Sequence, residues 1–261
     1  FYVRVSKCVS GQDQPHCRQY TDGLGNSYYK PYGLLQTYGE HGGLKFGLMT
    51  GSYEKNDAGG VLRKNISYMG GDDAVAEDRE IDINTGRFIN QGTSNEGIVN
   101  TLNRLRLSGW DYDSNFYTDC DTWGISIGDF LTSGAENRQC RDWGNPLTEM
   151  YLEALRYFSG YEEPSPEYGV DDSSIISGLK SVTWEKPLNS VNACANCAII
   201  LLSTGLNNFD GDDLASASDL LDIANADGID TYTDIVGDSE GISSNNFMVG
   251  NASTGGTIDT C

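Results

Sequence analysis

The sequence predicts an α/β fold with a mostly parallel central sheet flanked by helices, and three observations support this class. Helix-like and strand-like segments alternate over much of the chain. An apolar run, Ala198–Leu202, stops at Ser203 and leads into an acidic loop, as a buried strand does at the carboxyl edge of a parallel sheet. The chain of 261 residues is long enough for one large core. We therefore predict a single domain over residues 1–261.

The first elements are read from glycine-bounded apolar patterns. Residues 30–43 are predicted to form a short helix that packs Leu34, Leu35 and Tyr38 and ends at a glycine. The alternating residues 44–48 predict a strand, and residues 59–71 predict a second strand paired with it. Residues 79–90 alternate on both sides of Asn84-Thr85-Gly86, which predicts a hairpin.

Two helices are predicted in the middle of the chain. Thr93, with Glu96 three residues later, has the spacing of a capping box before a helix. Residues 107–145, rich in glycine, aspartate and aromatic residues, are read as a stapled insertion. Pro146 then fits the first turn of the clearest helix, which ends at Gly160. Its expected inward stripe consists of Leu147, Met150, Tyr151, Ala154, Leu155 and Phe158.

The last third is predicted to complete the sheet. Residues 198–202 are predicted to form a strand, residues 214–228 a helix and residues 229–238 another strand, and residues 241–261 begin a following loop region. The chain opens at Phe1 on a strand-like alternation that nothing initiates. This start is typical of a piece of a longer, processed protein whose targeting signal lies upstream.

The charge of the chain excludes some partners. Asp and Glu outnumber Lys and Arg by 38 to 17, which gives a net charge of -21. Such a surface repels phosphate backbones and anionic lipid heads, so nucleic-acid binding is excluded. The sequence has no apolar run of the length that spans a bilayer, so no membrane span is predicted. A solvated acidic face is the ordinary reading of this excess.

The seven cysteines predict an oxidising compartment. Cys8 and Cys17 bracket one polar loop and Cys120 and Cys140 bracket another, and we predict both pairs as disulfides. Cys194 and Cys197 form a C-x-x-C motif. A zinc site lacks a second ligand pair nearby, and a redox motif would precede a helix, so a structural disulfide role is predicted. The remaining Cys261 could pair with a cysteine outside this sequence.

Three segments together resemble the von Willebrand factor A-type fold. Residues 30–52 look like its first helix and second strand, and residues 144–158 look like the loop and helix that normally begin with Gly-Thr-Pro. "CAIILLSTG" and residues 219–238 look like its fourth strand, the next helix and a strand that often ends in Gly-Asp. The resemblance implies an open sheet whose carboxyl edge carries the binding loops.

Longer segments are similar to the PilC/PilY family of type IV pilus tip-associated proteins. They include residues 29–67, "GIVNTLNRL", "WGNPLTEMYLEALRYFSG", the Cys8–Cys17 loop and "LLSTGLNNFDGDDL". The resemblance covers most of residues 1–240. It implies an extracellular or cell-surface protein, exported through the periplasm, that primes pilus assembly and mediates attachment. Minor pilins of the tip complex and a host or surface ligand are the implied partners.

The resemblance also raises the question of a metal ion. A-type domains hold a divalent cation with an Asp-x-Ser-x-Ser loop, a Thr and an Asp. Here the Thr position matches Asn145, the Asp position matches Thr204, and no Asp-x-Ser-x-Ser loop occurs at the expected place. Neither residue supplies a negative charge, so we expect a degenerate magnesium site. Asp210 and Asp212 could bind calcium instead, although the loop fails the EF-hand pattern and Asp212 or Asp213 also fits a helix cap.

The sequence supports an enzymatic function less well than a non-enzymatic one. "GISIG" around Ser126 matches a nucleophile elbow, but no histidine follows it, which argues against a Ser-His-Asp hydrolase. Paired carboxylates such as Glu162-Glu163 are common in so acidic a chain. We therefore expect a non-enzymatic adhesive and assembly protein with no certain cofactor. The alternatives are a purely structural brace of the pilus tip complex and a secreted carbohydrate-active enzyme.

Overall fold

The computed structural model describes thirteen stretches of the chain, and they fall into two compact units. Unit 1 comprises residues 1–48 and 63–105, and unit 2 comprises residues 49–62 and 106–261. The described residues are 7–10, 14–55, 58–71, 79–89, 97–105, 110–111, 116–117, 145–166, 168–174, 178–203, 237–241, 246–249 and 257–260.

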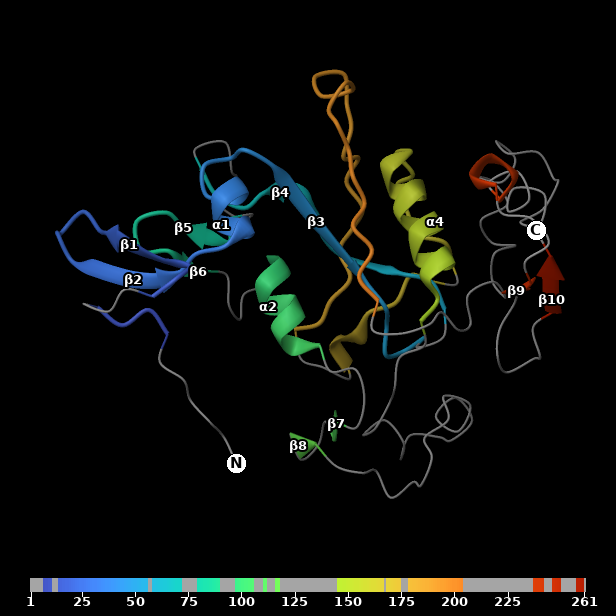
Figure 1. Ribbon diagram of the computed structural model, residues 1–261, viewed down its shortest axis with the longest axis horizontal. Coiled ribbons are helices and arrows are strands. Elements are labelled where there is room, and N and C mark those ends of the chain that lie inside the picture. Colours follow the sequence, from blue (N-terminus) through green and yellow to red (C-terminus); the bar gives the residue numbers. More distant parts are fainter. Residues whose placement is uncertain are drawn as a thin grey trace. The chain divides into compact units, whose positions relative to one another are not determined.

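Unit 1 begins with a disulfide and a hairpin. Cys8 and Cys17 are joined by an S–S bond, which confirms the pairing predicted from the sequence. Strand β1 (Cys17–Thr21) pairs antiparallel with β2 (Ser27–Pro31) (Figure 1). In this pairing Tyr20 lies opposite Tyr28. Tyr20 is buried, and its hydroxyl donates a hydrogen bond to the buried carboxylate of Glu40. Burial, followed by this hydrogen bond, raises the pKa of Tyr20 well above its ordinary value.

Asp22 holds the turn of this hairpin. Its carboxylate accepts hydrogen bonds from the backbone N–H groups of Leu24 and Asn26, each at 2.9 Å, and from the Tyr28 hydroxyl at 3.0 Å. It also accepts one from the Asn26 side chain. The side-chain bond from Asn26, then the backbone bond from the same residue, lower the pKa of Asp22 to about 2.

Acid should open this turn, because the depressed pKa links it to pH. The contribution of the Asp22 carboxylate is present above the unfolded-state pKa of about 3.9 and is lost as the pH falls through the folded-state value. We expect the amide NMR shifts of Leu24 and Asn26 to titrate with a midpoint near 2, and this titration should vanish in Asp22→Asn. A midpoint near 4 would show that the carboxylate is not held as described.

Helix α1 (Leu34–Gly39) forms where a helix was predicted, but it buries other residues. Leu34 is 74% exposed and Tyr38 is 49% exposed, whereas Gln36 and Gly39 are buried. Gln36 turns back, and its side-chain oxygen accepts a hydrogen bond from the Gly33 N–H. The expected packing of Leu34 and Tyr38 is therefore wrong, because capping and the close approach of Gly39 to Met69 set the buried face.

Two further strand pairs match the predicted elements. Strands β3 (Lys45–Thr50) and β4 (Val61–Tyr68) are neighbours in a two-stranded sheet, and each contributes residues to both units. Strand β5 (Ile81–Asp82) pairs antiparallel with β6 (Arg87–Phe88). Gly86 in the turn between them has a φ of 64° and no room for a Cβ beside the ring of Tyr20, so glycine is required there.

Helix α2 (Gly97–Arg104) starts with a cap from a distant residue. The carboxylate of Glu80 accepts a hydrogen bond at 2.7 Å from the N–H of Ile98, and both residues are buried. The predicted capping residues Thr93 and Glu96 lie outside the described residues. Ile98 is buried, whereas Leu102 is 50% exposed.

Unit 2 is organised by helix α4 (Leu147–Phe158), which confirms the clearest helix of the sequence. Its expected apolar stripe is wrong in part. Tyr151 is 44% exposed, and the buried positions are Glu149, Glu153, Arg156 and Tyr157. A short 3-10 helix, η3 (Asp172–Ser174), follows. The unit also contains two small antiparallel pairs, β7 (Trp110–Asp111) with β8 (Phe116–Tyr117) and β9 (Asn246–Val249) with β10 (Thr257–Thr260).

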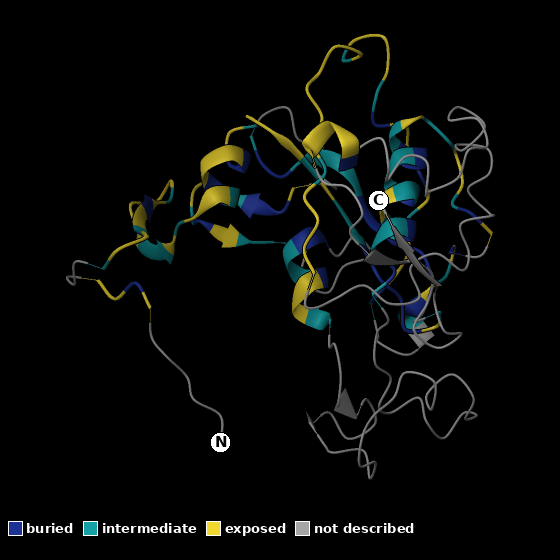
Figure 2. Ribbon diagram, turned by 45° about the vertical axis from the view of Figure 1, so that its right-hand side comes forward, coloured by how far each residue is buried: buried dark blue, intermediate teal, exposed yellow. Residues whose placement is uncertain are grey.

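The strand predicted at 198–202 is not formed. These residues have no assigned strand pairing, and Ile200 and Leu202 are 83% and 88% exposed. They belong to an excursion, residues 178–203, whose two extended legs rise above the ribbon in Figure 1 and whose upper loop is exposed in Figure 2. Among the described residues, no strand pairs with this segment, and a ladder requires a neighbouring strand.

The parallel sheet predicted from the sequence stays a prediction. The four strand pairings with a defined register are antiparallel hairpins. The helix predicted at 214–228 lies outside the described residues, as do most of the strand predicted at 229–238 and most of the 107–145 insertion. Among the described helices, none is long and apolar enough to cross a bilayer.

Candidate functional site

Two buried carboxylates of helix α4 bind the loops on either side of it. Glu149 accepts a hydrogen bond at 2.7 Å from the N–H of Gly59, just before β4. One turn later, Glu153 accepts hydrogen bonds from Ser165, from its N–H at 2.8 Å and from its hydroxyl at 2.9 Å. Arg156 lies 3.3 Å from Glu153 and balances one of these buried charges. The helix therefore fixes both loops through charge-assisted hydrogen bonds.

The carboxylate of Asp172 likewise fixes the loop after β3 through hydrogen bonds. It is fully buried, and one carboxylate oxygen accepts three hydrogen bonds. The donors are the Ser52 hydroxyl at 3.0 Å, the Tyr53 N–H at 3.0 Å and the Glu54 N–H at 2.9 Å. The loop is thus tied to η3 across about 120 residues of sequence. These contacts give unit 2 a rigid frame around α4.

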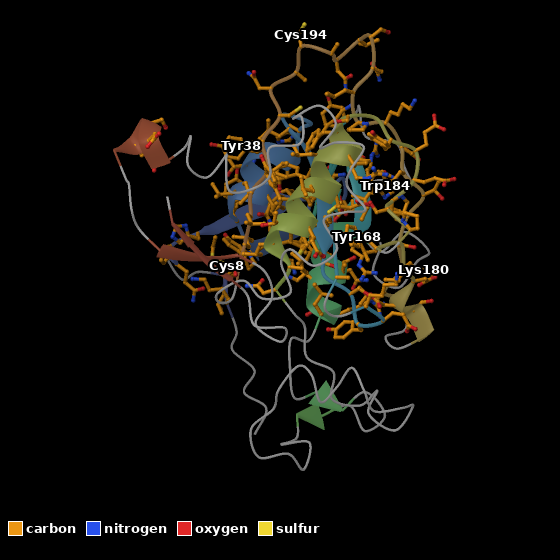
Figure 3. The ribbon with its side chains drawn as sticks, turned by 90° about the vertical axis from the view of Figure 1, so that its right-hand side faces the viewer. Cys8, Tyr38, Tyr168, Lys180, Trp184 and Cys194 are labelled. Atoms are coloured by element: carbon orange, nitrogen blue, oxygen red, sulfur yellow. A yellow bond between two sulfur atoms is a disulfide. The ribbon has the colours of Figure 1, made fainter. Side chains whose placement is uncertain are left out.

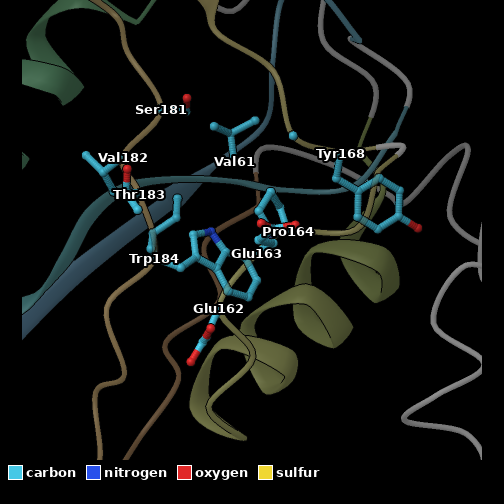
Figure 4. A pocket seen from close by; sticks show the side chains of 11 residues that line it. Val61, Glu162, Glu163, Pro164, Tyr168, Ser181, Val182, Thr183 and Trp184 are labelled. Atoms are coloured by element: carbon cyan, nitrogen blue, oxygen red, sulfur yellow. The ribbon is translucent and has the colours of Figure 1, made fainter.

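A pocket of about 340 Å³ lies in this frame, between the start of β4 and the residues that follow α4 (Figure 4). One side of the pocket is formed by residues 181–184, in the first extended leg of the 178–203 excursion. This leg is held in place because the Val182 N–H donates a hydrogen bond at 3.1 Å to the Leu62 carbonyl. The lining consists of Val61, Leu62, Glu162, Glu163, Pro164, Tyr168, Gly169, Ser181, Val182, Thr183 and Trp184.

Aromatic side chains form a firm wall of the pocket. Trp184 is 6% exposed, and its indole meets the ring of Tyr157 edge-on, with centroids 5.4 Å apart and planes at 82°. Tyr168 is buried, and its ring lies against Gly59, where no Cβ would fit. An indole fixed by its neighbours offers a preformed face to an apolar or cationic group.

Two carboxylates stand at the rim of the pocket. Glu162 and Glu163 are both exposed. The ammonium of Lys186 lies 3.0 Å from a carboxylate oxygen of Glu162, and Figure 4 shows that Glu162 lies near the Trp184 indole. Within the described part of the chain, no ion pair is recorded for Glu163. The rim therefore attracts cations and already holds one ammonium group.

Of the two predicted metal residues Asn145 and Thr204, the structure describes Asn145, which contacts the residue just before Thr204. The side-chain amide of Asn145 donates a hydrogen bond at 2.8 Å to the hydroxyl of Ser203. Ser203 directly precedes Thr204, which lies outside the described residues together with Asp210 and Asp212. No cluster of three or more His, Cys, Asp or Glu side chains suited to a metal ion occurs among the residues that the structure describes.

The cysteines of the excursion differ from the prediction. Cys194 and Cys197 are exposed and unbonded, so the disulfide role predicted for them is not seen. Figure 3 places Cys194 at the outer end of the excursion, far from Trp184 and Tyr168. The reason is local: the turn from Asn189 to Ala195 is closed by backbone and asparagine hydrogen bonds and does not need a disulfide. Cys120, Cys140 and Cys261 lie outside the described residues.

Sequence reasoning noticed only part of the pocket. It named Glu162 and Glu163 as one of several carboxylate pairs, without a partner for them. It gave no role to Trp184 or to Tyr168. The available signal was the clustering of Trp184, Glu185, Lys186 and Pro187 outside any predicted helix or strand, since a tryptophan in a loop is often held for packing or binding.

Comparisons with known proteins identify the family of the chain. Residues 46–261 match the family model described as PilY1 homolog, second domain. A curated relative, the type IV pilus biogenesis factor PilY1 homolog of Xylella fastidiosa (strain Temecula1 / ATCC 700964), is 34% identical over 200 residues. The match covers 73% of this chain and 12% of that relative, and no solved structure matches. The chain therefore belongs to the family of PilY1 homologs and contains the second domain of that family.

Proposed function

We propose that this chain is a non-enzymatic binding part of a type IV pilus-associated protein. In this proposal it supports pilus assembly and attachment at the pilus tip or the cell surface. The name of the curated relative supports the link to the pilus. Because the chain matches only 12% of that relative, the role of the whole protein is part of the proposal.

The proposed contact is the acidic rim of the pocket beside α4, and the proposed ligand is a lysine side chain of a pilus protein. The observation that carries this is the Lys186 ammonium, 3.0 Å from Glu162. It shows that an ammonium group fits at the rim. Glu163 can receive a second one, while the Trp184 indole and the apolar start of β4 accommodate an aliphatic stem.

The net charge of -21 favours the same class of partner. A strongly acidic surface attracts basic segments and speeds their association, and it repels acidic ones. Because Glu162 and Lys186 are largely exposed, each such pair contributes little by itself. Attachment through this rim should therefore weaken at high salt.

The test replaces both rim carboxylates in the complete protein in piliated cells. Glu162→Gln with Glu163→Gln removes two charges and keeps the shape, and Glu185→Gln is the matched control because Glu185 is exposed but does not line the pocket. We expect surface attachment and pilus number to fall about fivefold in the double variant, the effect of ~1 kcal/mol, and to stay unchanged in the control.

Two results would contradict the proposal. Normal piliation and attachment by the double variant, at normal protein level, would remove the rim from the function. Turnover of a glycan substrate that is lost on replacing Glu162 or Glu163 alone would instead establish the carbohydrate-active alternative.

A further inference from the structure

The negative charge of the chain is confined to one of its two units. Unit 1 contains as many lysine and arginine residues as aspartate and glutamate residues, so the net charge of -21 lies entirely in unit 2. In the described part of unit 1, every acidic side chain accepts hydrogen bonds from its own unit, and none is exposed. These residues are Asp22, Glu40, Glu80 and Asp82. The exposed charged side chains in this part of the chain are therefore cations.

Two of these cations lie over tyrosine rings. The Arg18 guanidinium lies 5.0 Å from the centroid of the Tyr32 ring and 5.3 Å from that of the Tyr20 ring, and its side chain is 44% exposed. The Arg87 guanidinium lies 5.0 Å from the centroid of the Tyr28 ring, and this residue is exposed as well. A guanidinium held over an aromatic ring keeps a fixed orientation, and its N–H edges can pair with an oxyanion.

The β1–β2 and β5–β6 hairpins, which lie side by side in Figure 1, bring the cations to one site. Arg18 lies opposite Lys30 in β1–β2, on the same face of the hairpin as the neighbouring tyrosine pair. Gly86, in the turn of β5–β6, lies so close to the Tyr20 ring that a Cβ would overlap it. The next residue is Arg87. The two hairpins therefore place three cations around one cross-strand pair of tyrosines.

An internal carboxylate shows how this site binds an anion. Glu40 is 1% exposed and accepts a hydrogen bond at 2.8 Å from the Arg18 guanidinium and another from the Tyr20 hydroxyl. Within the described residues, no ion pair is recorded for Lys30 or Arg87. The site thus holds one arginine fixed by an internal anion and, beside it, two cations that can receive an external one.

We propose that Arg18, Lys30 and Arg87 form a binding site for an acidic polysaccharide, whose uronate carboxylates they recognise. A uronate chain carries at most one carboxylate per sugar ring, so a chain of net charge -21 repels it less than it repels a nucleic acid. Physiological salt screens this repulsion beyond about 8 Å, which leaves the local cations to decide binding. A stiff sugar chain also loses less conformational freedom on binding than a flexible acidic peptide does.

Binding of a fluorescent oligogalacturonate to the complete protein, followed by fluorescence anisotropy, tests the site. Lys30→Gln with Arg87→Gln should weaken binding at least about tenfold, because two charge-assisted contacts are lost. Lys45→Gln is the matched control and should keep the wild-type affinity. Lys45 is an exposed cation of the same unit and lies 4.9 Å from the Tyr68 ring centroid, but it belongs to β3. Arg18 is left in place, because its removal would leave a buried carboxylate without its cation.

Three results would overturn the proposal. The first is no binding by the wild-type protein, which is expected if acidic residues of the same chain occupy the cations. The second is equal affinity of the double variant and the wild type, which would place the binding elsewhere in the protein. The third is equally tight binding of poly-glutamate with the same number of carboxylates, lost in the same variant, which would assign the site to acidic protein segments.

This test is independent of the one for the rim of the pocket. Glu162→Gln with Glu163→Gln changes unit 2 alone and should not weaken binding of the oligogalacturonate. Conversely, the double variant of unit 1 keeps both rim carboxylates. Failure of either proposal therefore leaves the other standing.

Discussion

Replacing Gly59 with alanine should destabilise the chain by about 3 kcal/mol, the sum of backbone strain and overlap with a buried ring. Gly59 has a φ of 48°, and a Cβ at this position would fall on the ring of Tyr168. Tyr168 is 1% exposed, so displacing its ring would disturb the buried packing around it. The substitution would also displace the N–H that donates to Glu149.

The control for this prediction separates the two causes. Gly160 has a φ of 86°, but a Cβ there would meet only the Lys186 side chain at 3.8 Å. Gly160→Ala should therefore show strain alone, about 1 kcal/mol. Urea unfolding followed by tryptophan fluorescence measures both free energies. Equal losses in the two variants would mean that Tyr168 is not packed against Gly59.

Removing the carboxylate of Asp172 should lower the free energy of unfolding by about 3 kcal/mol. Asp172→Ala deletes three hydrogen bonds to one oxygen in a fully buried site, and two of their donors are backbone N–H groups. Asp172→Asn keeps an oxygen but loses the charge, so its loss should be smaller.

The adjacent residue supplies the matched control. Asp171 is exposed and accepts a hydrogen bond from the Ser173 N–H at 2.9 Å. Asp171→Ala should cost less than about 1 kcal/mol by the same urea titration. If the two alanine variants lost the same stability, the connection between η3 and the loop after β3 would not contribute to the fold.

Local patterns in the sequence predicted the local elements well. The Cys8–Cys17 disulfide, the hairpin around Gly86 and helix α4 were all expected, because each depends on residues close in sequence. Glycine, proline and alternation act over a few residues and do not require knowledge of the rest of the chain.

The buried faces were predicted less well, because long-range hydrogen bonds decide them. Helix α4 buries Glu149 and Glu153, and α2 is capped by Glu80 from another hairpin. A pattern that counts apolar residues assigns such carboxylates to solvent. In the structure they are buried because each accepts backbone hydrogen bonds that compensate its charge.

Local sequence patterns did not predict the candidate pocket, for a similar reason. Its lining comes from β4, from the residues after α4 and from the first leg of the excursion. Only the Glu162-Glu163 pair was visible as a motif. The positions of Trp184 and Tyr168 follow from packing against Tyr157 and Gly59, which no local pattern encodes.

Carbodiimide cross-linking in piliated cells tests the proposed function most directly. The reagent joins a carboxylate to a lysine in contact with it, and mass spectrometry identifies both residues. Our account predicts that Glu163 is linked to a lysine of a type IV pilus protein, that the link is lost in Glu163→Gln, and that Glu185 forms no such link. Complete absence of a Glu163 link to any pilus protein, in cells where other links of this chain are recovered, would contradict it.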